Sequence, residues 1–460
     1  MAGARPERGE PAPQRASDGH AVTARRRRVL FISADPIGHE MAGLGIRYWE
    51  LARTLAAHAD VTIAHGGTDR LDGDVRTILF DPHRPAALHP AIDDADVVVT
   101  HPQWPLVTRW LRRARARIVF DLYDPETLET LELLGGQPLP VRRQMTATTV
   151  DRLHDALRTG HHFMCASETQ RDLWLGAMLA LRLIDPATYD RDPGMRSIID
   201  LVPFGVPELA PAPSAGPGPR ERVPALGEDD EIVLWGGGVW RWLDAETAIR
   251  AVVDLARRRP SVRLVFMGAS SRHPAARQSV EAARALAREL GAFGSLVHFY
   301  DGWVPYAERA AWLLQADCAL SCHRDHLETR FAFRTRTLDC FWGGLPVVCT
   351  EGDDLAEYVA REGLGAACPP ADPQAVGVAV EQVLERGRDA YATALRAAAS
   401  AHTWPNVARP LLRWVDGEPA PERPGDAPGI VRLPLAQRAR EGAYRLGGRR
   451  LLARRARRRG

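Results

Sequence analysis

The sequence predicts an α/β protein made of two doubly wound domains, each a parallel sheet covered by helices. Three observations favour this class. Short, continuous apolar runs alternate with segments of helical periodicity along most of the chain, as in βαβ units whose strands are buried on both faces. The alternation stops in a Pro- and Gly-rich stretch at residues 208–230 and then resumes. The length of 460 residues also exceeds what one hydrophobic core normally holds.

The same patterns set the expected boundaries. The first residues are rich in Pro, Gly and Arg but lack the apolar core of a signal peptide, and the last part of the chain is again Pro- and Gly-rich. We expect a disordered tail at 1–27, a first domain at 28–207, a linker at 208–230, a second domain at 231–400, a final helix at 401–415 and a basic tail at 416–460.

The overall composition excludes several classes of protein. Lys and Arg together number 60, all of them arginine, against 58 Asp and Glu, so the net charge of +2 does not indicate a nucleic-acid binder. No apolar run approaches the roughly 18 residues of a membrane-spanning helix. The six cysteines lie mostly in apolar surroundings without the spacing of a disulfide framework, which is typical of reduced thiols in a cytoplasmic protein.

The first domain begins with the apolar strand Val29–Ser33, a polar and glycine-rich loop, and a helix predicted at 46–58. The strand Val61–Ala64 follows. Strand, glycine loop, helix and strand in this order are the start of a doubly wound unit. Later in the domain, Ser167 precedes another helical segment and is expected to cap it.

Two further strands of this domain end in polar residues. Ala95–Thr100 is followed by His101, and Arg117–Phe120 leads directly to Asp121. Because the carboxyl ends of parallel strands meet at one edge of the sheet, where open α/β folds bind ligands, we take His101 and Asp121 as candidate substrate contacts. A turn-capping role for the histidine and a helix-capping role for Asp121 and Asp124 are the alternatives, and capping is favoured for Asp124.

The second domain begins with the strand Glu231–Trp235 and three glycines. Of these, Gly237 and Gly238 allow a backbone loop to approach a phosphate group closely. Strands and helices then alternate through Leu320. This alternation predicts a second Rossmann-like domain.

The stretch from Phe333 to Thr350 carries most of the functional information. Its first half has helical spacing, which places Arg336 and Asp339 on one side of the helix. Its second half is a glycine turn that leads into an apolar strand. A cation suits a phosphate and a carboxylate suits ribose hydroxyls, so we predict a nucleotide-sugar site. An ordinary helix–turn–strand with a surface ion pair is the alternative.

The pattern in this stretch, aromatic-x-T-(K/R)-x-L-(E/D)-x3-(A/G)-G-x-P-V-V, resembles the nucleotide-sugar motif of retaining glycosyltransferases of family 4. The resemblance covers roughly residues 29–415 and implies the GT-B fold: two Rossmann-like domains with parallel sheets facing a central cleft, and a final helix at 401–415 that crosses back to the first domain. It also implies transfer of a sugar, with retention and without metal or other cofactor, from a UDP- or GDP-type donor. The acceptor is a glycan, a lipid-linked molecule or a small molecule.

The resemblance implies roles for a loop of the first domain as well. In the family, the glycines of the loop after the first strand let the backbone approach the donor diphosphate and the acceptor. The corresponding residues here are Gly43 and Gly45, and Arg47 at the start of the next helix either adds a charge to that site or lies on a solvated face. His101 matches a histidine that members often carry near the sugar. His101 and Asp121 are thus the candidate catalytic residues.

The chain departs from the family pattern in two places. Many members carry an arginine and a lysine around the first loop of the second domain, where this chain offers Arg241 or, instead, an arginine of the motif. The usual two acids separated by seven residues are also altered, because Asp339 occupies the second place but Phe331 the first, with Glu328 as the nearest carboxylate. The expected donor-binding residues are Gly237, Gly238, Arg241, Glu328, Arg334, Arg336 and Asp339.

Two other functions fit the same architecture. One is a nucleotide-sugar epimerase, and the other is a non-catalytic GT-B scaffold that supports a partner transferase, an alternative that the altered acids and the missing arginine–lysine pair leave open. A catalytic triad, a G-x-S-x-G motif and a metal-ligand cluster are absent from the sequence. The arginine-dense tail is either solvated or a weakly amphipathic helix on anionic lipid at the inner membrane face.

Overall fold

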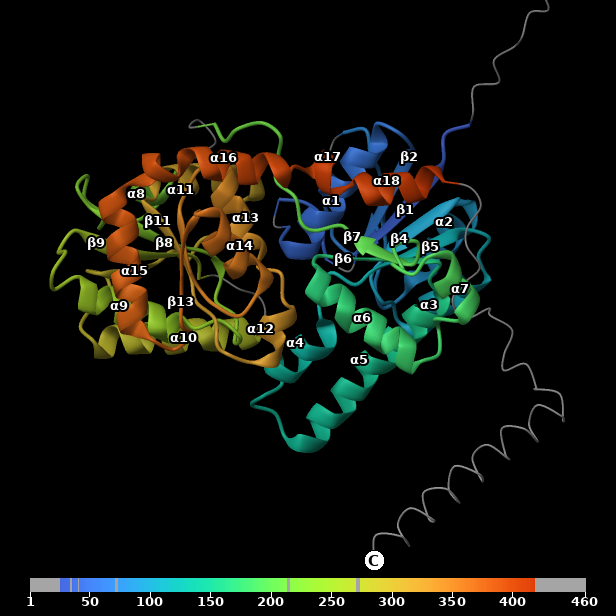
Figure 1. Ribbon diagram of the computed structural model, residues 1–460, viewed down its shortest axis with the longest axis horizontal. Coiled ribbons are helices and arrows are strands. Elements are labelled where there is room, and N and C mark those ends of the chain that lie inside the picture. The colour runs from blue at the N-terminus through green and yellow to red at the C-terminus, as the bar shows by residue number, and fades with distance from the viewer. Residues whose placement is uncertain are drawn as a thin grey trace, which may run out of the picture.

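The computed structural model describes residues 25–417, apart from residues 34, 40, 71–72, 213–215 and 270–273. It consists of two lobes side by side, joined by a linker and by helices that run from one lobe to the other (Figure 1). The prediction of two parallel α/β domains is confirmed. The predicted N-terminal tail and the predicted basic tail, for which contact with anionic lipid is one of two alternatives, lie almost entirely outside the described residues.

The first domain is a parallel sheet of seven strands in the order β3-β2-β1-β4-β5-β6-β7. Alternate residues of β1 enter two different cores, Val29 and Phe31 on one face and Leu30 and Ile32 on the other. Burial on both faces explains the continuous apolar runs. The strands are β1 (Arg28–Ser33), β2 (Asp60–His65), β3 (Arg76–Leu79), β4 (Val97–Thr100), β5 (Arg117–Asp121), β6 (His162–Cys165) and β7 (Ile199–Leu201).

Helices cover both faces of this sheet. Ser167 caps α6 as predicted, because its side chain accepts a hydrogen bond from the backbone N–H of Gln170. The first-domain helices are α1 (Gly43–Ala56), η1 (Pro85–Ala87), α2 (Leu88–Asp94), α3 (Pro105–Arg113), α4 (Glu126–Leu133), α5 (Leu139–Thr159), α6 (Glu168–Ala180) and α7 (Pro186–Arg191).

The second domain is a parallel sheet of six strands in the order β10-β9-β8-β11-β12-β13. Its core is continuous with the core of the first domain on the α1 side. The strands are β8 (Glu231–Gly238), β9 (Val262–Gly268), β10 (Val297–Phe299), β11 (Cys318–Ser321), β12 (Val347–Thr350) and β13 (Gly365–Cys368).

The remaining helices belong to the linker, the second domain and the final crossing. They are α8 (Pro219–Arg222), α9 (Ala245–Leu255), α10 (Pro274–Glu289), η2 (Tyr306–Glu308), α11 (Arg309–Gln315), α12 (Leu327–Phe331), α13 (Thr335–Trp342), α14 (Asp354–Glu362), α15 (Pro373–Arg386), η3 (Arg388–Tyr391), α16 (Ala392–Ala401), α17 (Trp404–Val407) and α18 (Arg409–Asp416). No helix in the described part of the chain is long and apolar enough to span a membrane.

The chain returns to the first domain through α16, α17 and α18, which follow the upper edge of both lobes in Figure 1. Val206 and Thr403 form an isolated parallel bridge at the junction, and the Arg117 side chain donates hydrogen bonds to the Trp414 and Val415 carbonyls at the end of α18. These contacts fix the two domains relative to each other.

In both sheets the order of successive strands reverses next to the first strand of the domain. β1 pairs with both β2 and β4, and β8 pairs with both β9 and β11. Ligands of doubly wound folds bind outside the carboxyl ends of the strands at such a switch point. The loops that follow β1 and β8 are therefore where the fold places a site. All six cysteines are free and buried, mostly in strands.

Candidate active site

A cavity of about 320 Å³ lies between the two domains, beside the loops that follow β1 and β8. Its first-domain wall is the start of α1, with Met41, Gly43 and Phe204. Its second-domain wall is the glycine loop of β8, the loop after β10 and the first turns of α11 and α13. Two predicted donor residues, Arg336 and Asp339, both line this interdomain cavity.

The glycine loop brings bare backbone to the cavity wall. Gly237 adopts a positive φ of 82°, which favours glycine. A Cβ at the neighbouring Gly268 would lie 2.5 Å from the Gly237 carbonyl carbon, so the ends of β8 and β9 can approach only because that residue is glycine. The Gly238 carbonyl accepts hydrogen bonds from the Arg336 Nη2 at 2.9 Å and from the Trp235 Nε1 at 3.4 Å.

Arg336 presents a partly buried positive charge that has no carboxylate partner among the described residues. It lies in the first turn of α13, and its guanidinium carbon is 5.5 Å from the centre of the Trp235 ring. Nη1 is buried and has no hydrogen-bond partner, and the described residues include no carboxylate within ion-pair distance of this side chain. Burial, with a smaller effect of Arg334, lowers the pKa of Arg336 to about 9. A bound anion would relieve this cost.

Asp339 is held by an arginine that the sequence analysis did not identify. The Arg309 Nε donates to Asp339 Oδ1 at 3.0 Å, and its Nη1 donates to the Tyr306 carbonyl at 2.7 Å. The guanidinium carbon lies 3.6 Å from the centre of the Tyr306 ring and 4.5 Å from that of Trp342. Arg309 is 7% exposed, whereas the Asp339 side chain is 28% exposed.

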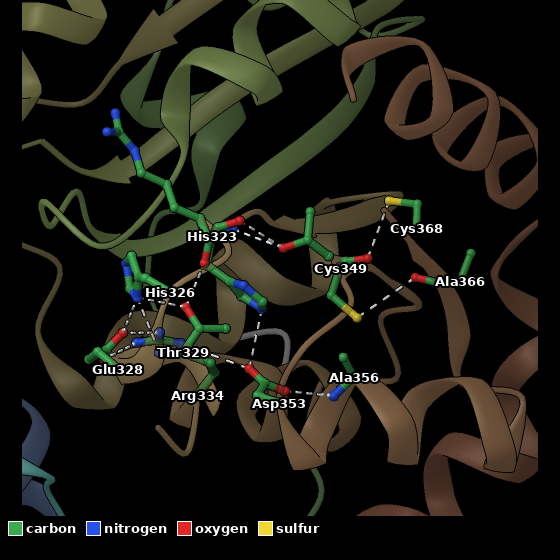
Figure 2. A network of polar contacts seen from close by, with 12 residues as sticks. His323, His326, Glu328, Thr329, Arg334, Cys349, Asp353, Ala356, Ala366 and Cys368 are labelled. Carbon is green, nitrogen blue, oxygen red and sulfur yellow. Dashed lines mark hydrogen bonds and ion pairs between the residues drawn. The ribbon is translucent and has the colours of Figure 1, made fainter. Parts of the chain in front are cut away.

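A second polar network precedes α13 (Figure 2). Arg334 donates from Nη1 and Nη2 to the two oxygens of Glu328, at 2.9 and 2.7 Å, and its Nε lies 3.9 Å from Asp353. Asp353 also faces the His323 Nε2 at 3.3 Å and caps α14. All these side chains are buried. The network fixes the segment that leads into the Arg336 turn.

The first domain contains a separate cavity of about 220 Å³ at the carboxyl ends of β4 and β5. His101 and Arg152 line it together with the carboxylates of Asp124 and Glu129. Burial and, to a smaller extent, the positive charge of Arg152 lower the pKa of His101 to about 4, so this imidazole is neutral at pH 7. The Asp124 side chain is exposed to solvent, and the carboxyl groups of Asp121 and Asp35 lie near it. We name this the first-domain cavity.

The second domain, which carries the glycine loop, is similar in sequence to a known family. Residues 230–386 match the family model Glycosyl transferases group 1. The second domain resembles group 1 glycosyltransferases. The match includes the glycine loop, Arg309, Arg336 and Asp339. No curated protein sequence matches the chain significantly.

Solved structures resemble nearly the whole chain. Sucrose-phosphate synthase from Thermosynechococcus elongatus has a TM-score of 0.60 at 18% identity, covering 84% of this chain and 97% of its own. UDP-forming α,α-trehalose-phosphate synthase from Burkholderia xenovorans has a TM-score of 0.61 at 11% identity, covering 85% and 98%. Anabaena HepE, in complex with UDP-glucose, has a TM-score of 0.57 at 12% identity, covering 83% and 97%. These likenesses concern the fold, and the predicted GT-B architecture is confirmed.

Three residues expected to bind the donor lie elsewhere in the second domain. Glu328 and Arg334 neutralise each other in the buried network and are not among the residues that line the interdomain cavity. Arg241 packs against Gly135 of the first domain, since a Cβ there would lie 3.0 Å from the Arg241 Nη2. Phe331, at the first acid position of the family motif, contacts the first domain through its carbonyl, which accepts from Gln170 at 2.8 Å.

Arg47 and Asp121 also differ from expectation. The Arg47 Nε and Nη2 donate to the two oxygens of Asp121 at 2.7 and 3.1 Å, and the same guanidinium donates to the carbonyls of Val202 and Pro203. Arg47 is fully buried, so it is neither on a solvated face nor free for a phosphate. Asp121 borders the first-domain cavity but is held by this pair.

The remaining first-domain predictions have mixed outcomes. Gly43 lines the interdomain cavity with a φ of 31°, and a Cβ at Gly45 would lie 2.7 Å from the Pro36 carbonyl oxygen, so this glycine serves close packing. Asp124 does not cap α4, whose start has no side-chain cap. The described residues contain no cluster of three side chains that could hold a metal.

One feature of the sequence could have indicated a role for Arg309. It is a charged residue at the start of a helix whose next residues, Ala310 to Leu313, are apolar and buried. A charge at the edge of a buried apolar face needs a partner. That partner, Asp339, is thirty positions away, and the sequence alone does not bring the two together.

Proposed function

We propose that the protein is a glycosyltransferase that moves a sugar from a nucleotide-diphosphate sugar to an acceptor bound by the first domain. One observation carries the proposal: the partly buried Arg336, which has no carboxylate partner among the described residues, lies beside the open backbone of the glycine loop. A diphosphate suits this site because it can pair with a cation that has no carboxylate partner. The neighbouring glycine loop also lets backbone N–H groups approach a phosphate.

The same features support the chemistry of transfer. As the bond to the sugar breaks, negative charge grows on the departing nucleotide diphosphate. Arg336 and the backbone N–H groups of the glycine loop stabilise that charge at the wall of the interdomain cavity. We further propose that the reaction retains the anomeric configuration and requires no metal. In that case the leaving phosphate itself assists deprotonation of the acceptor.

We propose a UDP-type donor because Anabaena HepE, with the same fold, was solved in complex with UDP-glucose. Asp339 would then accept hydrogen bonds from the ribose. In the first-domain cavity, the neutral His101 imidazole can accept a hydrogen bond from an acceptor hydroxyl. Separate cavities for donor and acceptor hold both reactants before the reaction begins.

The test is isothermal titration of UDP and UDP-glucose, followed by product analysis with candidate acceptors. Arg336→Ala should weaken binding by about 1.5–3 kcal/mol, because a charge-assisted contact to phosphate is lost. Arg250→Ala is the matched control, since this arginine lies on the exposed face of α9 and pairs with Glu246. Equal affinity of wild type and Arg336→Ala would refute the assignment.

Product analysis also separates the two alternative functions. Conversion of the nucleotide sugar without an added acceptor would indicate an epimerase. Absence of nucleotide-sugar binding, with co-purification of a second transferase, would indicate a scaffold. Under the proposed function, products require an acceptor.

A further inference from the structure

Arg336 and Asp339 lie three residues apart on one side of α13, a spacing at which opposite charges ordinarily pair. Such a pair would neutralise the cation that the proposed function assigns to the diphosphate. The described residues show no ion pair between them. Asp339 pairs instead with Arg309 from α11. This choice of partner requires an explanation.

Resting on the proposed function, we infer that Arg309 is a positioning residue for the donor site: it engages Asp339, and thereby leaves Arg336 free for the diphosphate and fixes the Asp339 carboxylate for the hydroxyls of the donor. This role goes beyond binding the donor directly. In this role a third side chain, that of Arg309, prevents the two opposite charges of α13 from pairing with each other.

The geometry around Arg309 suits this role because its guanidinium has little freedom. The Tyr306 ring lies against it, the Trp342 ring is also close, and Nη1 is engaged by the Tyr306 carbonyl. Ring contacts and a fixed hydrogen bond hold the planar group with Nε toward Asp339. A lysine ammonium at this position would lack the planar group that stacks on the rings and the several N–H donors with fixed directions.

The contact also leaves half of the carboxylate available. Nε occupies only Oδ1 of Asp339, and no hydrogen bond to Oδ2 occurs within the described residues. The side chain remains 28% exposed at the cavity wall. A carboxylate held by one oxygen and open at the other can accept from a hydroxyl of a bound nucleotide.

A carboxylate of the first domain faces the same guanidinium. Glu50 of α1 is 9% exposed, and its charge interacts with that of Arg309. Burial raises the pKa of Glu50, and the charges of Arg53 and Arg309 offset part of this effect. Arg309 thus lies where the two domains meet, between the acid of the donor helix and an acid of the opposite domain.

The inference predicts coupling between Arg309 and Asp339 in donor affinity. Arg309→Met should weaken UDP binding about tenfold or more, because Asp339 is released to pair with Arg336. In an Asp339→Asn background the same change should have little effect, since no carboxylate remains to compete for Arg336. Arg250→Met is the matched control and should not alter affinity in either background.

The experiment is a double-mutant cycle measured by titration calorimetry with UDP, with thermal melting of each variant to verify folding. If Arg309→Met does not fold, Arg309→Lys replaces it, with a smaller loss expected. A merely structural arginine would weaken binding equally in the wild-type and the Asp339→Asn backgrounds, and that additive result overturns the inference. If the wild type binds UDP and Arg309→Met binds it equally well, only the inference fails; absence of UDP binding to the wild type refutes the proposed function as well.

Discussion

The Arg47–Asp121 ion pair provides the sharpest test of how the first domain is held together. Both residues are almost fully buried, and the guanidinium also donates to the carbonyls of Val202 and Pro203, which join β7 to the linker. Arg47→Met removes the cation and leaves the Asp121 carboxylate unpaired in the core. Breaking a buried pair in this way typically costs about 3–5 kcal/mol of unfolding free energy.

The cost can be separated from that of lost packing. Methionine keeps most of the volume of the stem, so the expected loss arises mainly from the stranded charge and the two carbonyls. The double variant Arg47→Met/Asp121→Leu removes both charges and should recover most of the loss, because apolar replacement of a whole buried pair is often neutral. Arg53→Met on the same helix is the control, because this arginine is 58% exposed and should change stability by less than about 0.5 kcal/mol.

The assay is urea unfolding followed by tryptophan fluorescence, with the unfolding free energy compared among the four proteins. A loss of less than about 1 kcal/mol for Arg47→Met would refute the reasoning, because it would mean that water or another cation compensates Asp121. A double variant as unstable as the single one would show that the hydrogen bonds to the Val202 and Pro203 carbonyls, rather than the charge, dominate.

Three further outcomes follow from the structure. Arg388 donates to the carbonyls of Leu313, Leu314, Ala316, Gly343 and Gly344, so Arg388→Ala should lower stability by about 1–3 kcal/mol in thermal denaturation, and Arg388→Lys should recover only part of it. Arg117→Ala should speed amide hydrogen exchange in α18, measured by mass spectrometry, because this side chain stacks on Trp414 and bonds the carbonyls at that helix end; unchanged exchange would show that α18 docks by apolar contacts alone. For Glu50, burial raises the folded pKa above the unfolded value, so its contribution to stability falls as pH rises between the two values; Glu50→Gln should gain stability relative to wild type from pH 4 to pH 8 in thermal melts, and a difference that does not change with pH would contradict the assigned environment.

The layer architecture was accessible from the sequence because it depends on local patterns. Continuous apolar runs predicted buried parallel strands, and Ser167 before an apolar periodicity predicted a capped helix, as found. Boundaries were less accurate. The helix predicted at 46–58 spans Gly43 to Ala56, because its start has no side-chain cap that a sequence pattern could reveal.

The partners of the buried polar side chains could not be predicted from the sequence, because they are distant along the chain. Arg47 and Asp121 are 74 residues apart, and only the pairing of the strands brings them together. The motif alone placed Arg336 and Asp339 on one side of a helix, and both do line the interdomain cavity. It did not reveal that Arg309 would engage Asp339 and leave Arg336 unpaired, since that depends on how α11 packs beside α13.

The most direct test of the account is a crystal structure with UDP bound. The account predicts that the diphosphate lies against the glycine loop within hydrogen-bond distance of the Arg336 guanidinium, with Asp339 still joined to Arg309 and its free oxygen on the ribose. Nucleotide bound beside Arg241, away from Arg336, would contradict it.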